Sequence, residues 1–309
     1  MRACACFAAT SDIEMVRDAD GKIPLEEFID LRARCMALRE ILVPDEIWPA
    51  FLEWHRTGDD VASHSSVVLL AYRRGYLPKV TGPVHRYLLT ETGVSPNARK
   101  QYVKDLREKW MLDPDPGERH RLSRIFRGRL IELQYAEWLE AQNYSITGME
   151  AIRRGPDIEA RSKVGEASSY EVKFFGMEDG DFQILLKSMS GGAAGGAISV
   201  YQPLNYLVFR VYQAAVQLAS AAGERVVVIV IDGLAWFRFD MQVRGGWINW
   251  STAAFNQVDE AWKTFMDAQP KGWPSTTELR EAIKQVNRVK IYQQNAAFEF
   301  ALELDAKVS

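Results

Sequence analysis

Features that mark several other protein classes are scarce in this chain of 309 residues. It has only three cysteines, Cys4, Cys6 and Cys35, and an odd number without paired spacing argues against a disulfide framework and predicts a reducing, cytoplasmic setting. No apolar run reaches the roughly 20 residues that a membrane helix needs, so we expect no membrane span. The apolar stretch 3–10 is also too short for a secretory signal.

The patterns of several common active sites are missing as well. The four histidines do not follow the spacing of a zinc site, and no cysteine pairs with them. The glycine-rich stretch 190–197 lacks the lysine and hydroxyl residue of a phosphate-binding loop and the spacing of a dinucleotide fingerprint. We therefore interpret this stretch as a flexible connector.

Charge is distributed unevenly along the chain. The formal net charge of −3 by itself argues against a nucleic-acid partner. Between residues 72 and 129, however, 14 lysines and arginines stand against 6 aspartates and glutamates, whereas the remainder carries 24 basic and 35 acidic residues. Such a basic segment is expected where one surface meets a polyanion, although a solvated helix face would give the same composition.

The basic segment contains a helix-turn-helix pattern. One helix is expected to end near Thr92, a turn follows at 93–94, and Ser95 and Pro96 are suited to cap and begin the next helix. The side chains predicted to face inward are Ala98, Tyr102 or Val103, and Leu106. The outer face would carry residue types that contact bases and phosphates, namely Asn97, Arg99, Lys100, Lys104 and Arg107. Helix pairs of this form also occur as packing elements, so DNA reading is a hypothesis.

Three regions are expected along the chain. Residues 1–115 form a mainly helical region that includes the helix-turn-helix and is predicted to bind DNA. Two prolines and a glycine within 113–117 favour a boundary there. Residues 120–240 form an α/β core, and residues 241–309 a C-terminal helical extension packed on it. Within the extension, the stretch 289–304 fits a helix or two strands, and its alternating apolar residues favour strands.

The core region begins with a helix that contains an unusual glutamate. Glu132 stands among apolar residues of the helix rather than on its solvated side. A carboxylate in apolar surroundings needs a partner, which is often a metal ion or a basic residue. Arg129 and Arg153 are the basic candidates.

Two strands further along carry the residues with the clearest chemistry. Because side chains alternate along a strand, Glu171 and Lys173 project from one face, and Asp157 can converge on Glu171 if its strand pairs with theirs. Two adjacent carboxylates are stable as anions around a cation, and a small set of oxygen ligands suits Mg²⁺. A neighbouring lysine can hold the attacking water or stabilise a phosphoryl transition state. The alternatives without catalytic chemistry are that Asp157 is an ordinary turn residue and that Glu171 and Lys173 form an exposed pair on a strand.

This pattern resembles the PD-(D/E)XK nuclease superfamily. Pro156-Asp157, thirteen further residues and then Glu171-Val172-Lys173 match its motif, and Gly128 and Glu132 match its first helix. The resemblance covers residues 120–240 and implies a restriction-endonuclease-like core of helix, mixed central sheet and helix. It further implies that Asp157, Glu171 and the Val172 carbonyl bind Mg²⁺, with Mn²⁺ as a substitute. By the same resemblance Lys173 activates water, Glu132 is an accessory acid, and Gln213 lies near the scissile phosphate.

The function that follows is a Mg²⁺-dependent endonuclease acting on double-stranded DNA, in restriction or phage defence. Cutting both strands takes two sites, so a homodimer is expected. One alternative is a DNA-binding regulatory or assembly protein that keeps the fold without the chemistry. An RNA-cleaving nuclease of the same fold is another.

Overall fold

The computed structural model describes residues 25–57, 67–90, 93–107, 113, 115–150, 155–176, 202–232, 274–295 and 297–308. The stretch 190–197, Arg153, Cys4 and Cys6 lie outside this part of the chain. Contacts divide the described residues into two units, an N-terminal unit that ends at Trp138 and a sheet unit that begins at Leu139.

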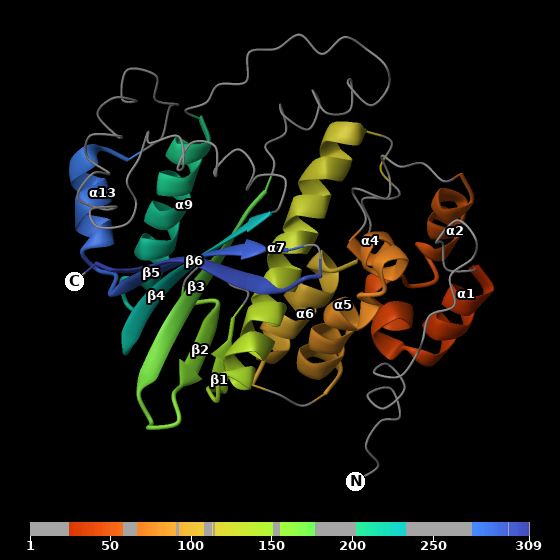
Figure 1. Cartoon of the computed structure of the whole chain (residues 1–309), viewed down its shortest axis with the longest axis horizontal. Coiled ribbons are helices and arrows are strands. Elements are labelled where there is room, and N and C mark those ends of the chain that lie inside the picture. The colour runs from red at the N-terminus through yellow and green to blue at the C-terminus, as the bar shows by residue number, and fades with distance from the viewer. Residues whose placement is uncertain are drawn as a thin grey trace. The chain divides into compact units, whose positions relative to one another are not determined.

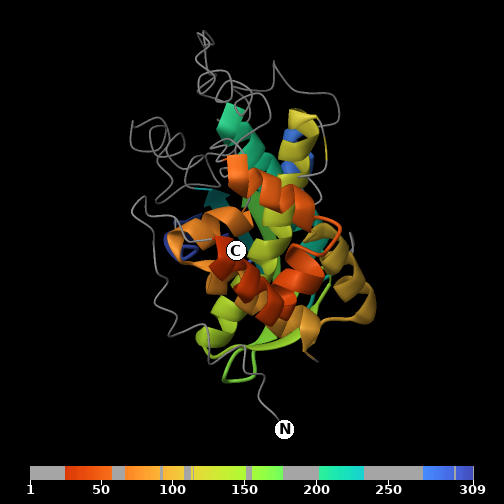
Figure 2. The ribbon, with the colours of Figure 1, turned by 90° about the vertical axis from the view of Figure 1, so that its right-hand side faces the viewer.

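Helices make up most of the described residues of the N-terminal unit. Figure 2 shows its first helices in red to orange. In chain order the helices are α1 (Leu25–Arg34), η1 (Ala37–Leu42), α2 (Trp48–Thr57), α4 (Val67–Arg74), α5 (Leu77–Val84), η2 (His85–Leu89), α6 (Pro96–Asp105) and α7 (Pro116–Ala141), whose last residues belong to the sheet unit. None of the described helices is long and apolar enough to cross a membrane.

The first helices of this unit pack through aromatic rings. The ring of Phe28 on α1 stacks on Phe51 of α2 with centroids 4.8 Å apart and meets Tyr72 of α4 edge-on at 4.5 Å. All three side chains are fully buried. Aromatic pairs in these geometries add stability beyond the area that they bury, so this contact joins three separate helices.

Helix α7 begins earlier than the sequence pattern suggests. Pro116 is its first residue, so the proline-rich segment 113–117 leads directly into a helix of 26 residues. Proline is favoured at the first helical position because its missing N–H would have no intrahelical partner there. The division between the two units falls near the other end of this helix, between Trp138 and Leu139.

The sheet unit has a mixed six-stranded sheet whose strands follow one another in chain order (Figure 1). The strands are β1 (Ser145–Met149), β2 (Ile158–Arg161), β3 (Ala167–Phe175), β4 (Glu224–Asp232), β5 (Arg288–Gln294) and β6 (Phe300–Lys307). Strands β1 to β3 are antiparallel neighbours, β3, β4 and β5 are parallel, and β6 returns antiparallel to β5. The predicted α/β class with a mixed sheet is therefore confirmed.

Two helices cover one face of this sheet. Helices α9 (Gln202–Leu218) and α13 (Thr276–Ile283) belong to the crossovers that make β3, β4 and β5 parallel (Figure 1). Residues of α9 and α13 share one buried apolar cluster with alternate residues of β4 and β5. In β4, the run from Val226 to Ile231 is buried on both faces, which explains its unbroken Val and Ile sequence.

The C-terminal region differs from a purely helical extension. Its described part contains α13 and then β5 and β6, which extend the central sheet. The alternation within β5 has its physical basis in the core, whereas Leu302 of β6 is 52% exposed. Ile291 lies opposite Leu304 across the β5–β6 ladder, and Val289 and Ile291 belong to the cluster under α9 and α13.

A glycine allows β4 to start beside β3. Gly223 has φ +73°, and a Cβ there would lie 2.2 Å from the carbonyl oxygen of Ala167. We expect Gly223→Ala to lower the free energy of unfolding by about 2–4 kcal/mol, from the left-handed backbone and the clash together. Gly165→Ala is the matched control, since φ is +88° there and nothing lies within 4 Å. Urea unfolding followed by circular dichroism compares the two, and equal losses would show that the clash relaxes without cost.

Candidate active site

The candidate site forms where β2 begins beside β3. The register places Ile158 opposite Tyr170, so Asp157, just before β2, falls opposite Glu171. Two hydrogen bonds join these positions. The backbone N–H of Asp157 donates to Glu171 Oε2 at 3.2 Å, and the N–H of Val172 donates to Asp157 Oδ2 at 2.9 Å. The convergence of Asp157 and Glu171 that the sequence predicts is thus present.

Both carboxylates are buried, and a lysine stands beside them. Glu171 has no exposed surface and Asp157 has 6%. Lys173 follows two residues after Glu171 on the same strand face, and its ammonium group pairs with Glu171 Oε1. The Lys173 side chain is 20% exposed, so it is the most accessible member of the group. Backbone N–H donors and a neighbouring cation are the partners that a buried carboxylate requires.

The charged residues lie on the sheet face that α9 covers. In the parallel register, Glu171 lies beside Val227 and Lys173 beside Ile229. Both β4 residues belong to the apolar cluster that contains α9. The intervening Val172 is buried on the opposite face, and its amide is the donor to Asp157. The metal-ligand role of the Val172 carbonyl stays a prediction.

The pair of carboxylates fits a magnesium ion in chemistry and number. Mg²⁺ is commonly bound in proteins by one or two carboxylates, and it keeps several waters that substrate phosphates replace. Asp157, just before β2, and Glu171, on β3, supply such oxygen donors next to each other. Within the described ranges, no group of three or more His, Cys, Asp or Glu residues is placed to hold a metal ion. Water and substrate would therefore have to complete the coordination.

Glu159 lies two residues after Asp157, on the same side of the strand, but is exposed. Its carboxylate extends over Gly148 of β1, where a Cβ would come within 3.1 Å of Glu159 Oε2. The absence of a side chain at Gly148 makes room for this arrangement. An exposed carboxylate that extends over Gly148 therefore accounts for Glu159 without a metal-ligand role.

Glu132 is held by a buried cluster in the N-terminal unit, which we name the Arg129 cluster: Tyr102 and Asp105 of α6 with Arg129 and Glu132 of α7. Arg129 Nη1 donates to both oxygens of Glu132 at 2.9 and 3.0 Å, and Tyr102 Oη donates to Glu132 Oε2 at 2.7 Å. Arg129 Nε donates to Asp105 Oδ2 at 3.1 Å. The need of Glu132 for a partner is thereby met, and Arg129 is the basic partner shown.

Charge and packing both stabilise the guanidinium group of this cluster. Burial by itself lowers the pKa of Arg129, but the charge of Glu132 and the hydrogen bonds to Glu132 and Asp105 outweigh it, so the pKa lies above its ordinary value. The guanidinium carbon also lies 5.4 Å from the centre of the Tyr102 ring, in a cation–π contact. Arg129 and Glu132 are three residues apart on one helix, which a sequence pattern reveals. The contact of Arg129 with Asp105, 24 residues away, leaves no such signal.

Helix α6 presents most of the predicted nucleic-acid residues to solvent. Its start is as expected, because the Ser95 side chain accepts a hydrogen bond from the Ala98 N–H and Pro96 is the first helical residue. Ala98, Tyr102 and Leu106 are buried. The exposed residues, which we name the α6 stripe, are Asn97, Lys100 and Lys104.

The remaining predicted contact residues have partners within the protein. Arg99 is partly buried and donates to the carbonyl of Thr90 at 3.2 Å. Arg107 pairs with Glu46 at 2.8 Å. Gln213, on α9, accepts a hydrogen bond from Arg210 Nη1 at 3.0 Å, and its place near a scissile phosphate stays a prediction.

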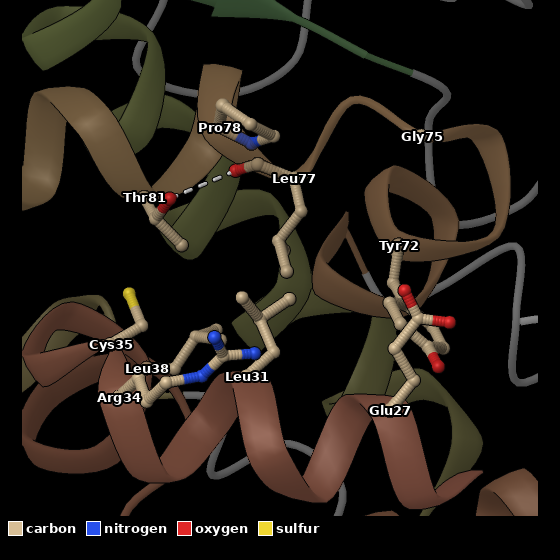
Figure 3. Close-up of a pocket in the computed structure, with 10 residues that line it drawn as sticks. All are labelled: Glu27, Leu31, Arg34, Cys35, Leu38, Tyr72, Gly75, Leu77, Pro78 and Thr81. Atoms are coloured by element: carbon tan, nitrogen blue, oxygen red, sulfur yellow. Dashed lines mark hydrogen bonds between the residues drawn. The ribbon is translucent and has the colours of Figure 1, made fainter. Parts of the chain in front are cut away.

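The N-terminal unit also contains a small hollow of about 70 Å³ (Figure 3). Leu31, Leu38 and Leu77 contribute to its apolar lining, and Glu27 lies beside Tyr72 at one end. Burial, and then the charge of Glu27, raises the pKa of Tyr72 above its ordinary value, so the phenol stays neutral. Ligand pockets usually enclose about 300–1,000 Å³, so this hollow is too small for a substrate of ordinary size.

Comparisons of this chain with protein-family models, with curated proteins and with solved structures find no match.

Proposed function

We propose that this protein is a Mg²⁺-dependent endonuclease that hydrolyses phosphodiester bonds of double-stranded DNA. The observation that carries the proposal is the placement of Asp157, Glu171 and Lys173 at one point of the β2–β3 ladder, with the two carboxylates buried and the ammonium paired to one of them. Two carboxylates and a cation gathered at one place on the sheet are the groups that metal-assisted phosphoryl transfer uses.

Each residue has a distinct role in this proposal. Asp157 and Glu171 would hold the metal ion, which would polarise the phosphate and lower the pKa of a bound water. Lys173 would stabilise the charge that builds on the phosphate, because its ammonium group already stands at the more accessible side of the pair. The chain order of α7, β1, β2, β3, α9 and β4 agrees with the restriction-endonuclease-like core that the sequence resembles. A restriction or phage-defence setting and a homodimer belong to the same proposal.

The partner is inferred from the N-terminal unit. The α6 stripe offers two lysines and an asparagine, which are residue types that contact phosphates and bases. The stripe also supports the alternative of a DNA-binding regulatory protein without catalysis. Helix α6 would be the second helix of a helix-turn-helix in either case.

Plasmid cleavage tests the proposal. Wild-type protein is expected to nick or linearise supercoiled DNA with Mg²⁺ and to lose this activity in EDTA. Asp157→Asn should abolish cleavage, because the amide can still accept from the Val172 N–H but carries no charge for the metal. Asp30→Asn, at an exposed position on α1, should cut at the wild-type rate.

Three results would contradict this proposal. Cleavage that persists in EDTA would exclude the metal mechanism. Intact DNA in every condition, together with salt-dependent DNA binding, would favour the regulatory alternative, and cleavage of RNA alone would reassign the substrate.

A further inference from the structure

We propose that the Arg129 cluster sets the rotation of α6 about its own axis, and thereby holds the α6 stripe in position to contact the phosphates of duplex DNA. The proposal deepens the proposed function and rests on its choice of DNA as the partner. It also gives Glu132 a positioning role in place of the role of accessory acid that the family resemblance implies.

The cluster attaches α6 to α7 at two points on one side of α6. Tyr102 Oη donates to Glu132 at 2.7 Å, and Asp105 accepts from Arg129 at 3.1 Å. The other oxygen of Asp105 accepts from Gln101 Nε2 at 2.8 Å, so the Asp105 carboxylate is fixed from both sides. Attachment points three residues apart lie on neighbouring turns of one helix face, and two such points prevent the helix from turning.

The α6 stripe lies on the opposite side of the helix from Tyr102, and about 80–140° around the helix axis from Asp105. At about 100° per residue, Lys100 and Lys104 stand about 160° from Tyr102, and Asn97 stands about 140° from it. Spacings of three and four residues align Asn97, Lys100 and Lys104 along one face. Exposure agrees with this geometry, because all three are exposed while Tyr102 is fully buried.

The cluster also controls the charge that α6 presents. Asp105 is the acidic residue of α6, and its carboxylate is directed to Arg129 with only 14% of the side chain exposed. Lys100 and Lys104 therefore face solvent without an acidic neighbour of their own helix beside them. A polyanion with regularly spaced phosphates suits this surface, because each lysine that meets a phosphate releases a condensed counterion.

Binding of a fluorescent DNA duplex in EDTA, measured over a range of salt concentrations, tests the inference without any cleavage. The first variant, Lys100→Gln/Lys104→Gln, is expected to bind more weakly. The slope of log K against log salt should become shallower by about 0.9 for each phosphate that the variant no longer neutralises. A wild-type slope in this variant would overturn the proposal.

The second variant, Tyr102→Phe/Asp105→Ala, separates positioning from charge. It removes both attachments of α6 but also removes a negative charge, so simple electrostatics predicts tighter binding. We expect weaker binding and a reduced slope, and we expect the two lysine substitutions to have little further effect in this background. An unfolded fraction alone would weaken binding at every salt concentration and leave the slope unchanged. Tighter binding, or full additivity with the lysine substitutions, would overturn the proposal.

Two further measurements complete the test. Glu118→Ala removes an exposed carboxylate that pairs with Arg121 on the same helix α7, and it should leave the slope unchanged. Glu132→Gln should keep the Mg²⁺ affinity of the wild type in calorimetric titration, and loss of Mg²⁺ binding would assign Glu132 to the metal site instead. Preference of the stripe for duplex RNA over DNA would overturn the choice of partner. Failure of the nuclease proposal would appear as intact DNA with these binding results unaltered.

Discussion

Glu171→Gln is expected to slow Mg²⁺-dependent DNA cleavage by about 10³-fold, which corresponds to about 4 kcal/mol of transition-state stabilisation. The substitution keeps the shape of the side chain and an oxygen that can accept from the Asp157 N–H. It removes the charge that attracts a divalent ion and also the partner of Lys173. Cleavage rates at saturating DNA and a series of Mg²⁺ concentrations measure the effect.

The control for this prediction comes from the same hairpin. Glu166 lies in the β2–β3 turn and is exposed, so Glu166→Gln changes the net charge equally without touching the site. Its cleavage rate should equal that of the wild type. Circular dichroism shows whether both variants are folded, and wild-type cleavage by folded Glu171→Gln would remove Glu171 from the metal site.

Arg129→Met is expected to destabilise the N-terminal unit by about 3 kcal/mol. Removing one partner of a buried ion pair typically costs about 3–5 kcal/mol because the other charge stays buried, and the lower end applies because 21% of the Arg129 side chain is exposed. Here two carboxylates lose their cation, since the Glu132 and Asp105 side chains are only 8% and 14% exposed. Urea unfolding followed by tryptophan fluorescence measures the change.

Arg121→Met is the matched control for this second prediction. Arg121 also pairs with a glutamate three residues away on α7, but both side chains are at least 36% exposed. Exposed pairs of this kind are worth about 0.2–1 kcal/mol. Similar unfolding midpoints for the two variants would mean that water or a rearranged side chain replaces Arg129 without cost.

The sequence predicted the geometry of the Asp157–Glu171–Lys173 group because that geometry depends on strand properties. Alternation places Glu171 and Lys173 on one face, and antiparallel pairing of β2 with β3 brings Asp157 opposite Glu171. The beginning of α6 was predictable for a similar local reason, since Ser95 and Pro96 act within one turn. The metal, the DNA and the cleavage reaction stay predictions.

Features that depend on distant residues could not be read in this way. The segment 113–117 has the composition of a linker, but Pro116 begins α7. Tyr102 and Val103 fit the inner face of α6 equally well by spacing, and the contact with Glu132 of another helix selects Tyr102. The addition of β5 and β6 to the sheet depends on parallel pairing with β4 across more than fifty residues of chain.

The pairing of Lys173 with Glu171 means that a lysine of this chain occupies the position of a positive charge beside Glu171 while no metal ion is bound. A structural zinc site contributes its binding energy to folding, so such a domain unfolds when the metal is withdrawn. Here Glu171, whose side chain has no exposed surface, is already neutralised by an ammonium group of the same strand. The β2–β3 ladder can therefore form before any divalent ion arrives, and an incoming ion has to compete with a resident charge that cannot diffuse away.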